Sequence, residues 1–307
     1  MRVHRRRWRL VIAFMVICTC LLAAYAVSWA SYLPKYSVQT VTISGNDAVP
    51  TKLLYDYVES LIYTGGHPFL SKSNIFLYNP SAIEREIVGY FPRISQATVS
   101  RASLLATSVT VTVDEREPYA LWCADAAQSN CYQMDETGFI FAQVPSAQVP
   151  SYTATSSSAV NAFFSSSQSR GYVFEGGVGS STSTSTSTEA QDAQNPQKNP
   201  IGHTFVSAHM PGILTLLKML GQAGFAPLGA RVDSEQDFSV PITQGFYVKA
   251  SYGEDPERIV SNLQLVLSSD ALAGHINQLE YVDLRFGDRV YYKLQGADEV
   301  TTSSSSS

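Results

Sequence analysis

The chain has 307 residues, of which 45% are hydrophobic and 15% charged, and its formal net charge is -5. Five of its 21 basic residues are arginines within the first nine positions, so the remainder carries 16 basic against 26 acidic side chains. This acidic balance argues against nucleic acid, or an anionic membrane surface, as the partner of that remainder.

The start of the chain differs from the rest: residues 1–9 form a basic tail, and residues 10–30 form an uncharged, mainly apolar run. A run of this length can cross the bilayer as one helix. Because cytoplasmic flanks are enriched in Lys and Arg, we expect a single-pass protein of the cytoplasmic (inner) membrane with its N-terminus inside and its bulk exported. A cleaved signal peptide is the alternative, since Ser28-Trp29-Ala30 fits a cleavage site, but signal cores of roughly 7 to 15 apolar residues are shorter.

Residues 36–115 predict the element order strand, helix, helix, strand, strand. A first strand leads into the turn at Gly45-Asn46. Apolar residues at helical spacing follow Pro50, and Asn79-Pro80 supplies the N-cap and first position of a second helix. Alternating apolar and polar residues then predict two paired strands, at residues 94–101 and 108–115.

Residues 116–295 predict a β-rich domain with flanking helices. One amphipathic helix is expected over residues 213–220, and a second opens at Asp255-Pro256. Residues 145–200 are dominated by Ser, Thr, Gln, Ala and Gly, and they predict a disordered insertion because they offer few large apolar groups. Residues 296–307 predict a disordered tail. The expected strands lie near residues 120–123, 132–135, 139–141, 228–233, 246–252, 279–286 and 289–294.

Four cysteines fall into two pairs. Cys18 and Cys20 lie in the apolar run and are interpreted as ordinary apolar helix residues. Cys123 and Cys131 bracket seven residues in a segment with the pattern of strand, loop, strand. Disulfides form and persist in the oxidising compartments that exported domains enter. A disulfide between Cys123 and Cys131 is therefore a hypothesis.

The sequence shows no carrier for catalysis. Its five histidines are scattered singly, and none has the spacing to Cys, His or Glu that predicts a metal site. It has no nucleophile elbow and no phosphate-binding glycine loop. Glu115 and Glu117 could form the acid-base pair of a cell-wall enzyme, but charges at a strand end are usually solvated or paired. We expect no catalytic residue, no metal or cofactor, and no small-molecule substrate.

Several short motifs follow the apolar run in a set order. They are Ile43-Ser44-Gly45-Asn46; Phe91-Pro92 with Val99 and Arg101; Val113 with Glu115-Arg116 and Pro118-Tyr119-Ala120-Leu121-Trp122; Met134-Asp135 with Gly138-Phe139-Ile140-Phe141; and Tyr281-Val282-Asp283-Leu284-Arg285-Phe286. Their order and spacing after a basic tail and one apolar helix resemble the bacterial cell-division family called FtsQ or DivIB. The resemblance covers residues 1–145 and 205–295 and leaves the insertion out.

The resemblance implies an α+β fold: one transmembrane helix, a POTRA domain (β-α-α-β-β) over residues 36–115, and the β domain of the family over residues 116–295. It implies a noncatalytic scaffold that links early and late components of the divisome at the septum. The implied partners are FtsB (DivIC)-like and FtsL-like single-pass proteins, and the complex would control septal peptidoglycan synthesis.

The last expected strand is the candidate partner-binding site. A strand at a sheet edge has unpaired N–H and C=O groups that can accept a partner strand, and aromatic side chains are favoured interface anchors. Tyr292 is expected to be an anchor whose replacement by a charged residue abolishes binding without unfolding the domain. Asp283 and Arg285, two residues apart, predict a structural ion pair. The candidate residues are Arg289, Val290, Tyr291, Tyr292, Lys293 and Leu294, with Tyr281 and Phe286 as further candidates.

Two other function classes remain as alternatives. A secretion or outer-membrane assembly factor also uses POTRA modules to bind extended polypeptides. Such a factor is expected to have repeated modules and a barrel, whereas one module and no series of amphipathic strands is visible. The other alternative is a membrane-anchored cell-wall enzyme, for which release of muropeptides by the exported domain is the test.

Overall fold

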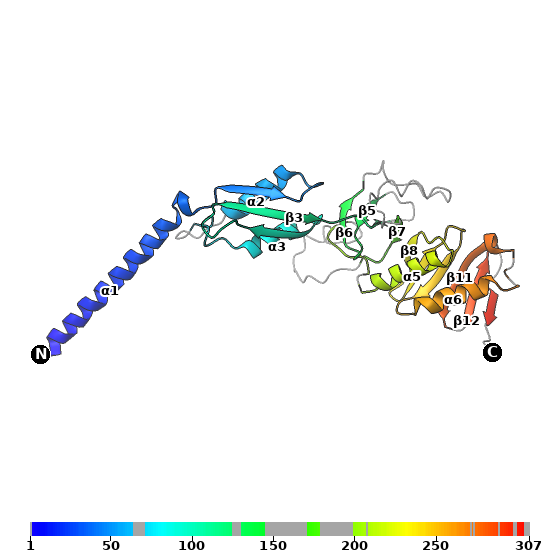
Figure 1. Cartoon of the computed structure of the whole chain (residues 1–307). Helices are drawn as coiled ribbons and strands as arrows, with labels where there is room; N and C mark the ends of the chain where they lie inside the picture. Colours follow the sequence, from blue (N-terminus) through cyan, green and yellow to red (C-terminus); the bar gives the residue numbers. More distant parts are fainter. Residues whose placement is uncertain are drawn as a thin grey trace. The chain divides into compact units, whose positions relative to one another are not determined.

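The computed structural model describes residues 2–63, 71–124, 130–144, 171–178, 199–206, 208–270, 272, 274–287, 289–296 and 300–303. The structure is of mixed α+β type, with one long N-terminal helix and two compact units, Met1–Arg116 (unit 1) and Glu117–Ser307 (unit 2) (Figure 1). Most of the predicted Ser/Thr-rich insertion lies outside the described residues.

Helix α1 (Arg2–Ser31) contains the predicted membrane-spanning run. Its segment Val11–Ser31 is long and apolar enough to cross a membrane, with a mean hydropathy of 2.4. Leu22 and Tyr25 are 69% and 71% exposed. Such a stretch of exposed apolar side chains is stable in lipid rather than in water. These properties suit a membrane anchor, and signal sequences share them.

Unit 1 has the element order predicted from the sequence. After a short 3-10 turn, η1 (Pro34–Tyr36), a three-stranded sheet forms in the order β1-β3-β2, in which β3 is parallel to β1 and antiparallel to β2. Two helices lie between β1 and β2 in the chain. The elements are β1 (Thr40–Ser44), α2 (Thr51–Tyr63), α3 (Pro80–Tyr90), β2 (Ile94–Ser100) and β3 (Ser108–Glu115).

The core of unit 1 follows from the alternation in its strands. Val109, Val111 and Val113 of β3 are fully buried, whereas the residues between them are at least partly exposed. Leu54 of α2 and Ile87 of α3 belong to the same buried cluster. Both helices therefore cover one face of the sheet, which buries the apolar side chains of both layers together.

The turn between β1 and α2 is fastened to the end of β3. Glu115 Oε1 accepts hydrogen bonds from the backbone N–H groups of Asp47 (2.8 Å) and Val49 (2.9 Å), and Oε2 accepts one from Ala48 (3.1 Å). Burial alone would raise the pKa of the Glu115 carboxyl, but the hydrogen bonds from these amides outweigh burial, so the pKa is lowered. Glu115 thus has a structural role in unit 1.

The described strands of unit 2 form one ten-stranded sheet, in the order β13-β12-β11-β10-β9-β8-β7-β4-β5-β6. Most neighbours are antiparallel, but β7 is parallel to β4 and β8, and β10 is parallel to β11. The strands are β4 (Ala120–Cys123), β5 (Cys131–Met134), β6 (Ile140–Gln143), β7 (Tyr172–Glu175), β8 (Gly229–Val232), β9 (Asp237–Pro241), β10 (Tyr247–Ser251), β11 (Leu279–Phe286), β12 (Arg289–Leu294) and β13 (Val300–Ser303).

Two helices pack against this sheet, α5 (Met210–Gln222) and α6 (Pro256–Leu267), and a 3-10 turn, η3 (Ile276–Gln278), precedes β11. Their buried side chains join alternate residues of the strands in one core cluster. Figure 1 shows both helices lying over the strands of this unit. One face of β10, β11 and β12 is therefore turned toward the helices and the other is turned away from them.

The predicted helix starts are confirmed in both units. Asn79 Oδ1 accepts a hydrogen bond from the backbone N–H of Ala82 at 3.2 Å, and proline follows as the first helical residue. Asp255 Oδ1 accepts one from Glu257 at 3.1 Å in the same way. Each side chain satisfies a backbone donor that the first turn of a helix leaves unpaired.

The prediction of one continuous disordered insertion over residues 145–200 is wrong at its centre. Strand β7 (Tyr172–Glu175) lies inside the sheet, and its first three residues are almost fully buried. The composition of the whole segment concealed a short run of aromatic and β-branched residues, which forms an inner strand between β4 and β8. Unit 2 therefore contains residues from both sides of the Ser/Thr-rich stretch and from within it.

The predicted disordered tail also contains a strand. Residues 300–303 form β13, which pairs antiparallel with β12. Val300, Thr301 and Thr302 are β-branched and favour extended backbone, and the edge of β12 supplies the hydrogen-bond partners that stabilise it. Strand β9, which lies between β8 and β10, has no counterpart among the strands expected from the sequence. The outermost strand on this side of the sheet is consequently β13.

Candidate partner-binding site

The structure brings the predicted site residues together on β11 and β12. These strands are antiparallel neighbours, in which Tyr281 pairs with Lys293 and Phe286 with Arg289. The side chains of β12 alternate between two environments. Val290 and Tyr292 are buried in the core of unit 2, and Leu294 is partly buried against it, whereas Arg289, Tyr291 and Lys293 alternate with them. The predicted residues thus divide between a core set and a surface set.

The expectation that Tyr292 is a surface anchor is wrong. Its side chain is 6% exposed and packs in the core cluster with Val290 and the helices. A charged residue at this position would be buried without a partner and would destabilise the domain. Only the backbone of Tyr292 is positioned to contact another strand, and in this structure it pairs with Val300 of β13.

The surface set forms what we call the outer face, which lies on the side of β10–β12 opposite the helices. Its aromatic rings contact charged or aromatic neighbours. Lys249 Nζ lies 3.9 Å from the ring centroid of Tyr281, and the rings of Phe286 and Tyr291 meet edge to face with centroids 5.2 Å apart. Such contacts hold the rings in place without burying them. The outer face comprises Tyr247, Lys249, Tyr281, Arg285, Phe286, Arg289, Tyr291 and Lys293.

Three residues of the outer face, Tyr247, Lys249 and Arg285, were not predicted as partner-binding residues, and Arg285 was expected only in a structural ion pair. The signal was present in the sequence, because Tyr247 and Lys249 alternate with the apolar Val248 in an expected strand. The missing information was which strands are neighbours. The parallel pairing of β10 with β11 aligns Tyr247 with Tyr281 and thereby places the two rings on adjacent strands of one surface.

The predicted ion pair between Asp283 and Arg285 connects the outer face to neighbouring strands of the sheet. Arg285 Nη2 lies 2.6 Å from Asp283 Oδ2, and Arg285 Nη1 lies 2.9 Å from Asp237 Oδ2 on β9. The hydrogen bond to Asp283 is the main cause that raises the pKa of Arg285. The hydroxyl of Ser251, together with Arg285, lowers the pKa of Asp237. The predicted structural pair Asp283–Arg285 is confirmed, and Asp237 joins it.

The hydrogen-bonding edge that was proposed for a partner strand is occupied within the chain. β13 pairs with β12 over four positions, from Arg289–Ser303 to Tyr292–Val300. The strand at this limit of the sheet is therefore a segment of four residues near the C-terminus. A partner strand can reach the sheet there either by pairing with the outer side of β13 or by taking its place.

A second group of side chains, His209, Phe238 and Tyr252, lies beside α5 and lines a cavity. His209 stacks on Tyr252 with centroids 4.3 Å apart, and Tyr252 stacks on Phe238 at 5.0 Å. Burial raises the pKa of the Tyr252 hydroxyl from the ordinary 10.0 to about 12. Among the residues that the structure describes, no cluster of three His, Cys, Asp or Glu could hold a metal ion.

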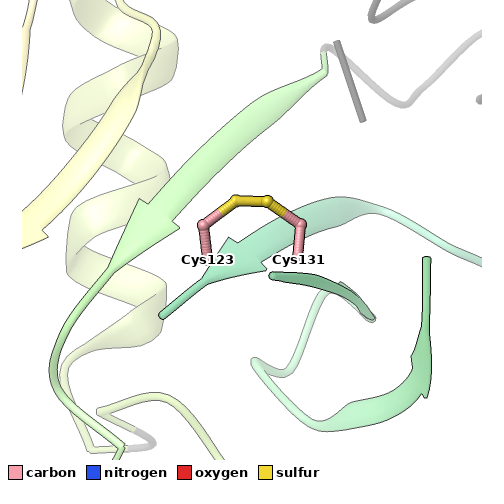
Figure 2. The surroundings of a disulfide bond; sticks show 2 residues. All are labelled: Cys123 and Cys131. Carbon is pink, nitrogen blue, oxygen red and sulfur yellow. A yellow bond between two sulfur atoms is a disulfide. The ribbon is translucent and has the colours of Figure 1, made fainter. Parts of the chain in front are cut away.

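The hypothesised disulfide is present in the structure. Cys123 ends β4, Cys131 begins β5, and the two residues are paired across the antiparallel ladder with Cα atoms 4.1 Å apart. Figure 2 shows the two sulfur atoms bonded between the strands. Both side chains are fully buried. The bond closes the connection between β4 and β5, whose middle residues 125–129 lie outside the described residues.

No protein-family model matches the chain, and no curated protein matches it. Three features of the chain itself therefore bear on its function. In unit 1 an exposed apolar helix is followed by the order strand, helix, helix, strand, strand. A larger sheet follows, whose outer face carries aromatic rings and basic side chains, of which Arg285 and Lys293 are paired with carboxylates. The last three strands of the sheet in chain order, β11, β12 and β13, lie between Leu279 and Ser303.

Proposed function

We propose that this chain is a noncatalytic scaffold of the bacterial divisome, of the FtsQ/DivIB type. α1 would anchor it in the cytoplasmic membrane with the basic tail inside, and the protein would act at the division septum. It would link early and late divisome components and bind FtsB (DivIC)-like and FtsL-like single-pass partners, through which septal peptidoglycan synthesis is controlled. Its proposed activity is binding, not catalysis.

The observation that carries the proposal is the order of elements in unit 1. The resemblance implies a POTRA domain over residues 36–115, and this region has the order strand, helix, helix, strand, strand directly after the apolar helix. Two residues of the resembling motifs have physical roles there. Gly45 takes the positive φ of the turn after β1, and Glu115 binds the amides of the same turn. The motifs that contain Gly45 and Glu115 thus meet at one turn, which the positive φ of Gly45 permits and the Glu115 carboxylate stabilises.

The outer face is the surface we assign to partner binding. It combines aromatic rings with the basic side chains of Lys249, Arg285 and Lys293. Of these residue types, Tyr, Phe and Arg are enriched at protein interfaces. Phe286 is 55% exposed and Tyr247 39%. A strand from the partner would extend the same sheet at β13 or in its place, so that side-chain contacts and backbone pairing act together.

The test is co-purification of the full chain with its FtsB-like partner from membranes of the source cells. Phe286→Asp and Tyr291→Asp put charges on the outer face and should reduce the recovered partner at least tenfold, since interface anchors are worth about 2 kcal/mol or more. The matched control is Leu265→Asp, because Leu265 is 57% exposed on α6, away from this face. Unchanged recovery with both outer-face variants would refute the assignment.

A further inference from the structure

The end of unit 1 nearest α1 is built from three chain segments. Backbone hydrogen bonds join them into one surface. Val38 N donates to Ser73 O at 2.8 Å, and Gln39 N donates to Thr107 O at 2.8 Å. We call this surface the α1-side end, and its segments are residues 31–39, 71–78 and 101–107.

Ser31, the last residue of α1, is hydrogen-bonded to the second segment of this surface. The Ser31 hydroxyl accepts a hydrogen bond from Ser71 N at 2.8 Å, and the buried Asn74 Nδ2 donates to Ser31 O at 3.1 Å. The segment that can cross a membrane also ends at Ser31. Where α1 spans a bilayer, the α1-side end consequently lies within one or two residues of the point at which the chain leaves the lipid.

The same surface exposes large apolar side chains. Leu104 and Leu105 are 77% and 67% exposed, and Phe76 is 59% exposed. Arg101 connects the two loops that carry these side chains. Its Nη1 donates hydrogen bonds to Ile75 O at 2.7 Å and to Leu104 O at 3.4 Å. Several exposed apolar groups on two loops that are tied together mark a surface with a binding role, whereas singly scattered ones do not.

The charges of the α1-side end are opposite to those of the chain as a whole. Its three segments contain Lys35, Lys72 and Arg101 and no Asp or Glu, although acidic residues exceed basic ones over the rest of the chain after the tail. Trp29 and Tyr32 at the end of α1 are 63% and 55% exposed. Tyr and Trp are enriched where a protein meets lipid headgroups, and basic groups are attracted to anionic lipid.

From these contacts we infer that the α1-side end of unit 1 rests in the surface of the bilayer. Phe76, Leu104 and Leu105 enter the boundary between headgroups and acyl chains, and the cations lie at the level of the lipid phosphates. Unit 1 is then not a domain on a free tether. It is attached at two kinds of contact, the spanning helix and these two loops, which fix how it stands on the membrane.

The test uses the full chain reconstituted in vesicles of phosphatidylcholine and phosphatidylglycerol. A photoreactive benzophenone side chain is placed at position 104, and in a second protein at position 53. Leu53 is the matched control because it is 51% exposed but lies at the start of α2, beside the turn that Glu115 binds at the far end of β3. After illumination, lipid adducts are measured by mass spectrometry.

We expect position 104 to give several-fold more lipid adduct than position 53. A probe at position 76 should also label lipid, and Leu104→Ser with Leu105→Ser should reduce that labelling, since the two loops enter together. Equal lipid labelling at positions 104 and 53 would overturn the inference. Labelling of a protein in place of lipid, when the same probe is activated in cells, would also overturn it.

Discussion

Arg285 of β11 and Asp237 of β9 form an ion pair of 2.9 Å that spans the intervening strand β10. The same guanidinium neutralises Asp283, which is 3% exposed. One cation therefore compensates two carboxylates from different strands. Asp283 cannot reach solvent, so it depends on Arg285 for its counter-charge. Arg285 therefore has a structural role in addition to its place on the outer face.

Replacing Arg285 should destabilise unit 2 more than replacing a comparable surface arginine. Arg285→Ala leaves a buried carboxylate unpaired and should cost about 2–3 kcal/mol of unfolding free energy. Arg231→Ala, whose partner Asp233 is more exposed, should cost less than about 1 kcal/mol. Urea denaturation followed by the fluorescence of the buried Trp122 measures both. Equal costs would contradict the proposed difference.

Glu115 should make the stability of unit 1 dependent on acid. Its folded pKa is lowered from the ordinary value of 4.5, so the stability it contributes is present in full above pH 4.5 and is lost as pH falls through the lowered pKa. Glu115→Gln should therefore destabilise at neutral pH by about 1–2 kcal/mol, and the difference from the native protein should shrink in acid. Urea denaturation at several pH values measures this.

The exposed Glu117 supplies the control for that experiment, since Glu117→Gln should leave stability unchanged across the same range. A loss in Glu115→Gln that is the same at every pH would show that the carboxylate charge is not what binds the turn.

Two glycines of unit 1 should respond in opposite directions to alanine. Gly45 has a φ of +85°, and a Cβ there would collide with the carbonyl oxygen of Val113. Gly45→Ala should destabilise by more than about 1 kcal/mol. Gly89 lies within α3, and beyond its chain neighbours and its own helix backbone no atom lies within 4 Å of its Cβ position, so Gly89→Ala should stabilise by about 0.5–1 kcal/mol. Hydrogen exchange of the β3 amides measures both changes, and the same sign for both would be contrary to the structure.

Where the partner strand takes the place of β13, removing residues 300–307 should strengthen partner binding. β13 covers the hydrogen-bonding edge of β12, so a partner strand that takes its place must displace it. The truncated chain should bind the FtsB-like partner more tightly in a pull-down titration. Removing only residues 304–307 leaves β13 in place and should have no effect. Weaker binding after the longer truncation would mean that the partner pairs with β13 itself.

Local signals in the sequence predicted most of unit 1. The alternation from Ser108 to Glu115 gave both ends of β3, and Asn79 marked the start of α3, because strand faces and helix caps depend on residues close in the chain. The pair Asp283–Arg285 was predicted for the same reason. Its third member, Asp237, was not, since it lies 48 residues away and meets Arg285 only through the sheet.

The errors concern which side of an element meets the core. Alternation in β12 separates Tyr291 from Tyr292 but does not tell which ring faces the helices, and that is decided by how α5 and α6 pack. β7 escaped prediction because four residues within a Ser/Thr-rich stretch give a weak local signal. Its identity as a strand depends on β4 and β8, which flank it.

Localisation of the full chain in dividing cells tests the scaffold proposal most directly. A fluorescent protein fused ahead of the basic tail would lie on the cytoplasmic side and leave α1, unit 1 and unit 2 unaltered. The proposal predicts a band of fluorescence at midcell that appears as the septum forms. Uniform fluorescence around the membrane of dividing cells, with a fusion that is intact by immunoblot, would contradict it.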